Sequence, residues 1–251
     1  MRRRRLVFGE DAELYDRVRP SYPAALIADM VELVGSGAHA VDAGCGTGKA
    51  AVLLARCGMD GVGVEPDARM AMVARRNLEP WPRWQVEVAE FETWAHQDHS
   101  FDLVTCAQAW HWLVPSVRLR RAHDLLRTGG WLALWWNRPA EDHSPLRLAL
   151  DGVYAELAPK LAPRGPASLP FAADEVPSGL RFASPIEREY RWSKAYSASG
   201  WTELLRSSSD HRLLNDDHRE RLLAAVARVI EDHGGSYRHQ YVCKLWARQR
   251  T

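Results

Sequence analysis

The sequence lacks the patterns that identify several large classes of protein. Its 251 residues include only four cysteines, and none of them stands in C-x-x-C or zinc-ligand spacing. No apolar run approaches the roughly 18 residues that cross a membrane, and no apolar segment behind the N-terminal arginines resembles the core of a signal peptide. We therefore expect reduced thiols at Cys45, Cys57, Cys106 and Cys243 in a cytoplasmic protein with no membrane span.

The sequence also lacks an excess of either positive or negative charge. Lysine and arginine number 33 against 32 for aspartate and glutamate, which leaves a formal net charge of +1. A strong basic excess marks many nucleic-acid-binding proteins, so a nucleic-acid partner is disfavoured here. The dense run Arg2 to Arg5 could touch phosphates or a membrane surface. Because terminal charge runs seldom have a packed partner, we interpret it as a solvated tail.

Motifs of several enzyme classes are absent as well. The sequence has no repeat, no low-complexity tract, no P-loop, no G-x-S-x-G elbow and no H-E-x-x-H signature, so we predict no metal site. Hydrophobic residues nevertheless make up 46% of the chain, which is enough for a sizeable core. The length suits one large domain or one domain with a cap, and it indicates no particular oligomeric state.

What the sequence does contain is a glycine-rich turn between two apolar segments. Residues 41–49 read V-D-A-G-C-G-T-G-K, and the apolar segment that follows, residues 50–57, suits a buried helix face. Gly44, Gly46 and Gly48 permit backbone angles that a Cβ would penalise, and they let the main chain approach a ligand closely. The free N–H groups of the following helix face the same space. A strand, a glycine turn and a helix in this order predict a ligand site.

An acidic residue at the next strand end indicates the kind of ligand. The apolar run Gly61 to Val64 ends in Glu65, and a carboxylate at a strand end can accept both hydroxyls of a ribose. The turn reads G-x-G-x-G, not the dinucleotide pattern G-x-G-x-x-G, and Asp42 stands two residues before its first glycine. An acid there would repel a pyrophosphate but attract the ammonium of an amino-acid moiety, directly or through water. We therefore predict a nucleoside ligand that carries an amino acid.

At these residues the sequence resembles the class I S-adenosylmethionine-dependent methyltransferases, whose first motif typically looks like V-D-x-G-C-G-T-G. The segments Y-D-x-x-R-P-x-Y-P at residues 15–23 and A-x-x-x-H-W at residues 107–112 are similar to a small-molecule, type 11-like subgroup. The N/D-P-P-Y/F tetrapeptide, common where a nucleobase or a glutamine amide is methylated, is absent. The resemblance implies methyl transfer from S-adenosylmethionine to a small-molecule acceptor by in-line displacement, with S-adenosylhomocysteine as product.

The resemblance also assigns residues to the cofactor. In the subgroup the N-terminal segment lies over the cofactor, so Arg19 would be available to the cofactor carboxylate; the alternative is a helix packed on the sheet with Arg19 in an ordinary ion pair. Met70 either reaches the adenine or packs in the core. Glu90 either accepts from the adenine amine or satisfies backbone donors at a helix start. The predicted cofactor-binding residues are Tyr15, Arg19, Asp42, Gly44, Cys45, Gly46, Glu65, Pro66, Met70, Ala89, Glu90 and Gln108.

The candidate catalytic residue is His111. It follows the predicted fourth strand, and ligands of open α/β sheets lie beyond the carboxyl ends of such strands. An imidazole titrates close enough to neutrality to take a proton from an attacking hydroxyl or amine, although a base is required only if the acceptor arrives protonated. The alternative is a packed corner in which the ring only hydrogen-bonds the backbone. Tryptophans gather nearby and could line a pocket for a flat or apolar acceptor: Trp110, Trp112, Trp135 and Trp136.

The alternation of strands and helices predicts an α/β fold with a doubly wound, mostly parallel, seven-stranded Rossmann-like sheet, an antiparallel edge pair and helical cap insertions. The predicted strands are residues 38–43, 61–65, 83–89, 101–106, 131–136, 186–192 and 239–246. Pro66 is expected to open a helix, and residues 127–130 to form a turn before the fifth strand.

We expect two halves of one domain. Residues 1–137 would form the N-terminal segment and the cofactor-binding half, and residues 138–251 the C-terminal half, with cap insertions at about 139–180 and 198–235. The alternative is that these insertions merely cover sheet edges.

Three other functional classes remain open. An NAD-dependent oxidoreductase would share the strand, the turn and Glu65, but Lys49 stands where its third glycine is expected. An RNA or protein methyltransferase should show a basic or peptide-binding surface. A non-catalytic cofactor-binding regulator would keep the glycines and lose the acceptor pocket.

Overall fold

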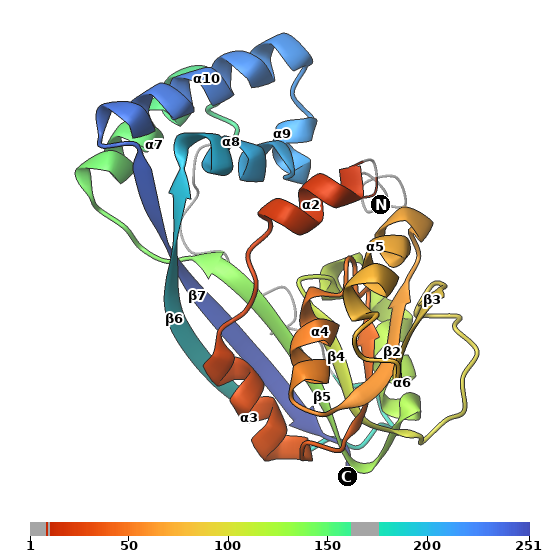
Figure 1. The fold of residues 1–251 in the computed structure, drawn as a ribbon. Helices are drawn as coiled ribbons and strands as arrows, with labels where there is room; N and C mark the ends of the chain where they lie inside the picture. Colours follow the sequence, from red (N-terminus) through yellow and green to blue (C-terminus); the bar gives the residue numbers. More distant parts are fainter. Residues whose placement is uncertain (1–8, 10, 162–175) are drawn as a thin grey trace.

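The computed structural model describes residue 9, residues 11–161 and residues 176–251 (Figure 1). The run Arg2 to Arg5 lies outside the described residues, so the prediction of a solvated tail stays a prediction. The elements of the first half are α2 (Ala12–Val18), α3 (Ala24–Val34), β1 (His39–Ala43), α4 (Lys49–Arg56), β2 (Asp60–Glu65), α5 (Ala68–Leu78), β3 (Trp84–Val88), β4 (Phe101–Ala107), the 3₁₀ turn η2 (Trp110–Trp112), α6 (Pro115–Leu125) and β5 (Leu126–Pro139). Those of the second half are α7 (Pro145–Leu157), β6 (Ile186–Ser197), α8 (Ala198–Arg206), α9 (Ser209–Arg212), α10 (Asp216–Asp232) and β7 (Ser236–Gln249).

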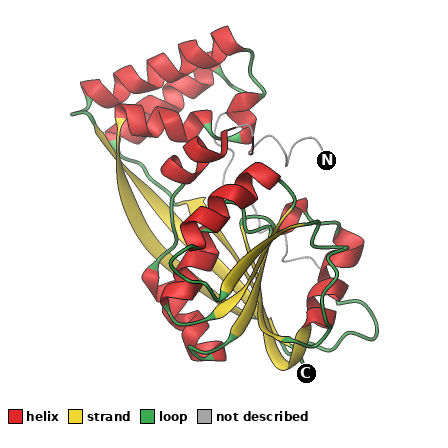
Figure 2. Cartoon of the chain, turned by 45° about the vertical axis from the view of Figure 1, so that its right-hand side comes forward, coloured by secondary structure: helices red, strands yellow, loops and turns green. Residues whose placement is uncertain are grey.

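The strands of the described chain form one seven-stranded sheet in the order β3-β2-β1-β4-β5-β7-β6 (Figure 2). Strands β1 to β5 pair in parallel, and β7 runs antiparallel to both β5 and β6. The predicted fold class is confirmed, including the antiparallel edge pair. Strands β1 and β4 are neighbours at the point where the winding of the sheet reverses, so the ligand crevice is expected beyond their carboxyl ends.

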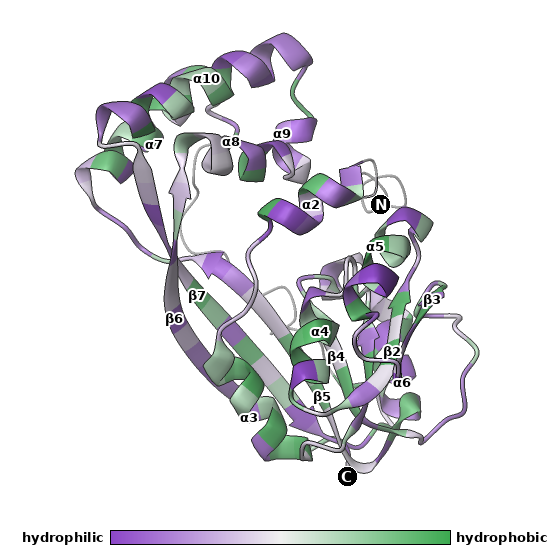
Figure 3. Ribbon diagram, in the orientation of Figure 1, coloured by the Kyte–Doolittle hydropathy of each residue, from purple (hydrophilic) through white to green (hydrophobic). Residues whose placement is uncertain are grey.

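Helices cover both faces of the sheet through separate hydrophobic cores. One core holds α3, α4 and α5, and the other holds α6 and the segment after β3. The adjacent residues Ala40 and Val41 enter opposite cores, as the pleat of a strand requires. Figure 3 shows the apolar residues along the strands and on α3 and α4. Leu26, Met30 and Leu54 are fully buried, and truncating any of them to alanine should cost on the order of 2 to 5 kcal/mol.

The start of α5 differs from the prediction. Pro66 precedes the helix, which begins at Ala68 with Asp67 as its N-cap. The Asp67 side chain accepts a hydrogen bond from the backbone N–H of Arg69 at 2.9 Å. An aspartate supplies the acceptor that the first helical N–H groups need, and this sets the start of the helix two residues later than the proline suggests.

The turn expected at residues 127–130 is part of β5. The register with β4 moves from Leu126 opposite Phe101 to Trp131 opposite Leu103, so the intervening residues bulge outward. Gly129 donates from its backbone to the carbonyl of Arg250 at 2.9 Å. The C-terminal residues thus supply a hydrogen-bond acceptor that no local pattern in the sequence reveals. The segment predicted as a turn is a bulge in β5.

The second half of the chain adds a helical cap, defined here as α7 to α10. Helices α7, α8 and α10 share a hydrophobic core with the ends of β6 and β7. β5 ends at Pro139 opposite Tyr241, whereas β6 continues to pair with β7 as far as Ser197 opposite Ser236. The cap therefore stands on a two-stranded arm, residues 192–197 and 236–241. Figure 1 shows the cap beyond this arm, with α2 between the cap and the sheet.

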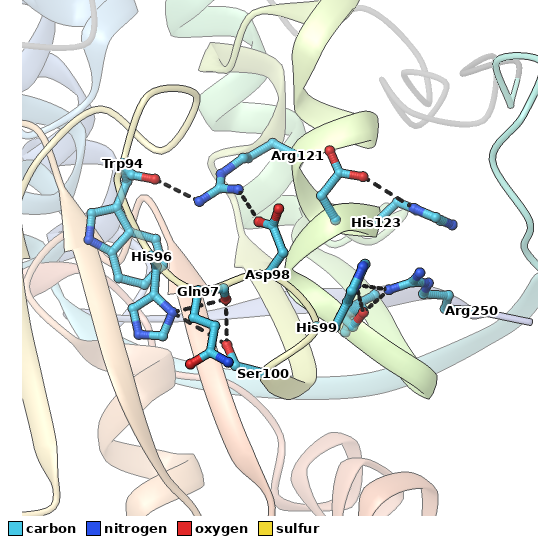
Figure 4. A network of polar contacts seen from close by, with 11 residues as sticks. Trp94, His96, Gln97, Asp98, His99, Ser100, Arg121, His123 and Arg250 are labelled. Carbon is cyan, nitrogen blue, oxygen red and sulfur yellow. Dashed lines mark hydrogen bonds and ion pairs between the residues drawn. The ribbon is translucent and has the colours of Figure 1, made fainter.

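The histidine-containing loop before β4 lies at the amino end of that strand, away from the expected crevice (Figure 4). Arg121 of α6 donates to the carbonyl of Trp94 at 2.6 Å and pairs with Asp98 at 3.0 Å. His99 contacts the carbonyl of Leu126 through Nδ1 at 3.2 Å. These contacts hold the loop against α6 and β5.

The described residues bear on three expectations, which concern the thiols, membrane-spanning helices and metal ligands. All four cysteines are free thiols. Within the described ranges, no helix is both long and apolar enough to cross a membrane. No group of three or more potential metal ligands occurs in that part of the chain.

Candidate functional site

The glycine turn after β1 depends on left-handed backbone angles. Gly44, Gly46 and Gly48 have φ values of +67°, +58° and +82°. The backbone N–H of Gly44 donates to the carbonyl of Val64 at 2.8 Å, which ties the turn to the end of β2. A Cβ added to Gly44 would lie 2.9 Å from the Cβ of Ala109. Glycine is therefore required at position 44 both by its φ angle and by the close approach of the segment after β4.

Glu65, the last residue of β2, spans the same turn. Its Oε2 accepts from the backbone N–H of Gly46 at 2.9 Å, and its Oε1 accepts from that of Asp67 at 3.0 Å. The side chain is buried. A carboxylate can accept about four hydrogen bonds, so these two contacts do not exhaust it.

Asp42 lies in β1 beneath the turn and is 1% exposed. Its Oδ1 accepts from the hydroxyl of Thr105 at 3.0 Å, whereas Oδ2 has no hydrogen-bond partner among the described residues. Burial, with a further contribution from the charge of Glu65, raises the pKa of Asp42 to about 7. A buried carboxyl oxygen without a donor is costly, and a ligand cation or a water that reached Oδ2 would remove that cost.

Most of the other predicted cofactor residues lie at the same edge of the sheet. Met70 is buried, and a Cβ on Gly46 would lie 3.5 Å from its Cε. The backbone of Ala89 donates to the carbonyl of Glu65 at 3.2 Å. Residues 91–93 form a turn and no helix, so Glu90 does not stand at a helix start. The residues gathered at the carboxyl ends of β1 to β3 are Asp42, Gly44, Cys45, Gly46, Glu65, Pro66, Met70, Ala89 and Glu90.

Helix α2 lies over this edge and covers the turn. The ammonium of Lys49 donates to the carbonyl of Asp16 at 2.6 Å, and the amide of Asn77 donates to the Asp16 carboxylate at 3.1 Å. Tyr15 packs beside Met70. Burial raises the pKa of Tyr15, and the nearby Glu65 carboxylate adds to the rise. The N-terminal segment thus lies over the glycine turn.

Arg19 extends from the end of α2 to the cap. Its Nη2 donates to the backbone carbonyl of Ser207 at 2.9 Å, and its guanidinium lies 5.1 Å from the centre of the Tyr15 ring. The predicted alternatives were the cofactor carboxylate and an ordinary ion pair. The structure places this cation between the N-terminal segment and α8.

A pocket of about 370 Å³ lies between the sheet, α2 and the cap, and we call it the cap pocket. Lys49 lines it and begins α4 directly after the glycine turn, so the pocket adjoins the turn. Its other main lining residues are Tyr15, Arg19 and Tyr22 from the N-terminal segment, Gln108, His111, Trp112 and Asn137 from the sheet end, Trp201, Leu204, Leu205, Ser208 and Asp210 from the cap, and His239 and Tyr241 from β7.

Gln108 begins the segment that forms the floor of this pocket. It has a φ of +61°, an uncommon conformation for a residue with a side chain, and its backbone N–H donates to the carbonyl of Trp135 at 3.0 Å. Backbone strain of this kind concentrates at functional sites. The turn of the chain at Gln108 brings the following residues, His111 and Trp112, back over the ends of β4 and β5.

His111 lies at the exposed rim of the cap pocket, beside the ring of Trp112 at 4.5 Å between centroids. Partial desolvation and the positive charges of Arg138 and Arg118 lower its pKa to about 4. The imidazole is therefore neutral at physiological pH. A group with so low a pKa binds a proton weakly, which limits its strength as a general base.

The tryptophan cluster divides between core and pocket. Trp110, Trp135 and Trp136 are fully or almost fully buried in the cores, and Trp112 lines the cap pocket. The sequence analysis did not single out Trp201, which meets the pocket from α8.

Several other pocket residues were also missed: Asn137, Ser208, His239 and Tyr241. His239 and Tyr241 stand two apart in β7 and so share one face, which is the one signal in the sequence that could have paired them.

Residues 41–134 match a family described as the methyltransferase domain. This range begins just before the glycine turn and ends inside β5, so it covers the parallel part of the sheet. Over residues 41–134 the chain is therefore similar to a methyltransferase domain. An uncharacterized methyltransferase of Mycobacterium tuberculosis is 37% identical over 132 residues, which cover 53% of this chain and 52% of the relative.

Two other similar proteins widen the comparison. The trans-aconitate 2-methyltransferase of Variovorax paradoxus is 31% identical over 145 residues, 56% of this chain and 54% of that protein. A solved structure from Anaeromyxobacter dehalogenans, provisionally described as a type II methyltransferase, covers 92% of this chain and 97% of its own, with a TM-score of 0.62 and 24% identity. At that identity the likeness shows the fold alone. The chain spans about half the length of the curated relatives it matches.

Proposed function

We propose that the protein transfers a methyl group from S-adenosylmethionine to a small-molecule acceptor bound in the cap pocket. The observation that carries this proposal is the position of that pocket. It lies beyond the carboxyl ends of β4 and β5, adjoins the glycine turn through Lys49, and is enclosed by α2 and the cap. Its volume of about 370 Å³ suits a metabolite better than a polymer.

The residues around the glycine turn fit this cofactor. The buried Oδ2 of Asp42, which has no partner among the described residues, is suited to an ammonium or to a water that an ammonium holds. Glu65 has acceptor capacity for ribose hydroxyls while it retains its two backbone contacts. Gly44 and Gly46 leave the main chain open to close approach. We assign the cofactor to eleven of the twelve residues predicted from the sequence; the twelfth, Arg19, lies with Gln108 at the border of the cap pocket, where it can face the acceptor.

The chain's own contribution to the reaction is alignment and exclusion of water. When bound, S-adenosylmethionine would supply a sulfonium methyl group, whose carbon a nucleophile would attack in line with S-adenosylhomocysteine as the leaving group. Helix α2 covers the turn, and α8 with α9 covers the far side of the cap pocket, so both partners would be held out of bulk water. His111 remains the candidate to accept a proton from the nucleophile, and its low pKa favours a hydrogen-bonding role or an acceptor that is already ionised.

Two further observations support a small-molecule acceptor. The relative from Variovorax paradoxus is named for trans-aconitate, a small organic acid. The near-neutral chain, with a formal net charge of +1, offers no general excess of positive charge to nucleic acid. We further propose that residues 1–137 mainly hold the cofactor and that residues 138–251 mainly shape the acceptor side.

Calorimetry and turnover test this proposal together. We expect S-adenosylhomocysteine to bind and NAD to give no signal, because the turn lacks the third glycine of the dinucleotide pattern. S-adenosylmethionine labelled on its methyl group should then label members of a metabolite panel and leave transfer RNA and histone peptides unlabelled. Binding of NAD alone, or labelling of RNA or peptide in place of metabolites, would overturn it.

A further inference from the structure

Three side chains form a hydrogen-bonded chain from the core of the cap to the cap pocket. The hydroxyl of Tyr154 in α7 lies 2.8 Å from Nε2 of His211, and Nδ1 of His211 lies 2.9 Å from the hydroxyl of Ser208. His211 is buried, whereas Ser208 lines the pocket. Helix α7 itself does not line the pocket, so Tyr154 can act on a ligand there only through His211.

The direction of these hydrogen bonds follows from the protons available. Burial is the main cause that lowers the pKa of His211, to about 4, so the ring is neutral with one N–H and one lone pair. Burial raises the pKa of Tyr154, which keeps its proton. Among the described residues, His211 is the one hydrogen-bond partner found for the Tyr154 hydroxyl. Tyr154 therefore donates to Nε2, and Nδ1–H donates to Ser208, because the reverse order would leave the phenolic proton without an acceptor.

In this arrangement the oxygen of Ser208 accepts from His211, and its own proton remains to be donated into the cap pocket. The guanidinium of Arg19 is next to it, because Nη2 donates to the carbonyl of the preceding residue, Ser207, at 2.9 Å. Lys49 adds a second cation to the pocket lining, partly offset by the Asp16 carboxylate at 3.5 Å. The cap side of the pocket thus combines a fixed hydroxyl donor with a neighbouring guanidinium, and Asp210, which also lines the pocket, adds a negative charge that partly offsets the two cations.

We propose that the methyl acceptor is a small organic anion, that its carboxylate is anchored by Ser208 and Arg19, and that Tyr154 and His211 are positioning residues that fix the Ser208 hydroxyl as a donor. A carboxylate only accepts hydrogen bonds, and charge-assisted bonds to it are about twice as strong as neutral ones. The assignment rests on the proposed function and names the substrate class of the same site. The carboxylate is the anchor, and the nucleophile would lie toward the sheet end of the pocket.

Equilibrium binding tests the substrate class without requiring turnover. Citrate, succinate and benzoate would be titrated into the full chain saturated with S-adenosylhomocysteine, against citramide, succinamide, benzamide and phenyl phosphate. We expect at least one carboxylate to bind at least about tenfold more tightly than its amide. A stronger response to phenyl phosphate than to every carboxylate, or equal binding of acids and amides, would overturn the assignment.

Variants of the three side chains test the anchor. Ser208→Ala should weaken carboxylate binding at least about tenfold, and Ser208→Thr should restore it. Tyr154→Phe should weaken it too, because Ser208 can then turn its proton toward His211. Tyr190→Phe, which loses a phenol bonded to Asp29 far from the cap, is the matched control. Affinity for S-adenosylhomocysteine should be unchanged in all of them, and unchanged carboxylate binding in Ser208→Ala would refute the anchor.

The tautomer of His211 gives a readout that a purely structural role would not move. In ¹⁵N-resolved nuclear magnetic resonance spectra we expect the proton on Nδ1 in the wild type and on a mixture of nitrogens in Tyr154→Phe. If the wild-type ring carries its proton on Nε2, both hydrogen bonds of His211 run in the opposite direction, and the proposal is refuted. Turnover of neutral acceptors by a chain that binds S-adenosylhomocysteine would remove this inference and leave the proposed function, whereas failure to bind S-adenosylhomocysteine would remove the proposed function itself.

Discussion

Glu65 joins the two parts of the candidate cofactor site, because one carboxylate touches the glycine turn and the start of α5. In Glu65→Ala we expect the loss of two charge-assisted hydrogen bonds to the ribose, a cost of about 2 to 4 kcal/mol, or roughly 30- to 1000-fold in affinity for S-adenosylhomocysteine. Isothermal titration calorimetry would measure it. The backbone N–H groups of Gly46 and Asp67 also lose their acceptor, so the melting temperature should fall as well.

A matched control separates these two effects. Glu87 in β3 accepts a hydrogen bond from Trp94 at 2.6 Å and does not touch the turn. Glu87→Ala should therefore lower the melting temperature with little change in affinity. If Glu65→Ala, shown to be folded by circular dichroism, binds as the wild type does, Glu65 is not part of the cofactor site.

Asp42 should make cofactor binding depend on pH. With its pKa raised to about 7 by burial, the carboxyl in the ligand-free protein is largely protonated at pH 6 and ionised at pH 8. A cationic ammonium binds the ionised form, so affinity for S-adenosylhomocysteine should rise by about tenfold between pH 6 and pH 8 and then level off. Calorimetry across this range would measure the change. In Asp42→Asn the profile should be flat, and a wild-type profile that is already flat would contradict the pairing.

The same group affects the stability of the ligand-free protein with a definite sign. Because the folded-state pKa lies above the unfolded value, folded chains hold more protons between about pH 4 and pH 7. The contribution of Asp42 to stability is therefore present below that window and is lost as the pH rises through 7. Bound cofactor should oppose this loss by stabilising the ionised carboxylate.

Replacing His111 tests whether a general base takes part in methyl transfer. If it does, His111→Ala should lower kcat by at least about tenfold with cofactor affinity intact, because such groups typically contribute roughly 10²- to 10⁴-fold in rate. Its pKa near 4 means that the ring is already neutral at pH 6, so wild-type kcat should show no His111 inflection between pH 6 and pH 8. Wild-type turnover in the variant would return His111 to a structural role, and a loss confined to cofactor affinity would do the same.

At the scale of elements, α3 shows that residues next to a helix in the sequence can mark both of its ends. The helix occupies Ala24–Val34, with Pro23 before its first turn and Gly35, which has a φ of +85°, at its end. Helix α2 has only seven residues before Pro20, and its position depends on contacts with α5 and α8. The core strands were predicted from signals of the same kind, because each is an apolar run bounded by residues that interrupt the apolar pattern.

The candidate site was predictable to the same degree. The glycine turn, Asp42 and Glu65 follow one another along β1 and β2, so their spacing in the sequence carries the geometry. Tyr154 and His211, by contrast, lie in two different cap helices whose packing depends on tertiary contacts alone. No periodicity links such residues, and their hydrogen bond could not be predicted.

The cap helices should control the choice of acceptor. Leu205 in α8 lines the cap pocket, whereas Leu213 just beyond α9 is 62% exposed. Leu205→Trp should reduce the space in the pocket and change kcat/KM for bulky acceptors by about tenfold or more, with cofactor affinity nearly unchanged.

Leu213→Trp adds the same side chain outside the pocket and is the control for this test. Competition assays with pairs of acceptors of different size would measure the preference. Equal loss of cofactor and acceptor binding in Leu205→Trp would argue against a division of labour between sheet and cap.

At the scale of the whole molecule, the cap is carried by the two-stranded arm, residues 192–197 and 236–241. Helix α2 contacts α8 of the cap and α5 beside the sheet. Two-stranded ribbons are marginally stable on their own, so the arm is the natural place for small changes in the position of the cap. The cap pocket is lined from the sheet, α2 and α8 together, and a ligand in it would join all three.

Hydrogen exchange should reveal this coupling. S-adenosylhomocysteine alone should slow exchange in the glycine turn and α2, because those elements border the cofactor site, and an acceptor added with it should extend the protection to α8 and α9. Helices α7 and α10 form the cap's own core and do not line the pocket, so their exchange should change least. Mass spectrometry of peptides from each segment would measure the rates. Uniform protection of the whole cap by S-adenosylhomocysteine alone would mean that the cofactor, and not the acceptor, orders α8 and α9, and the cap would then lose its role as the acceptor side of the site.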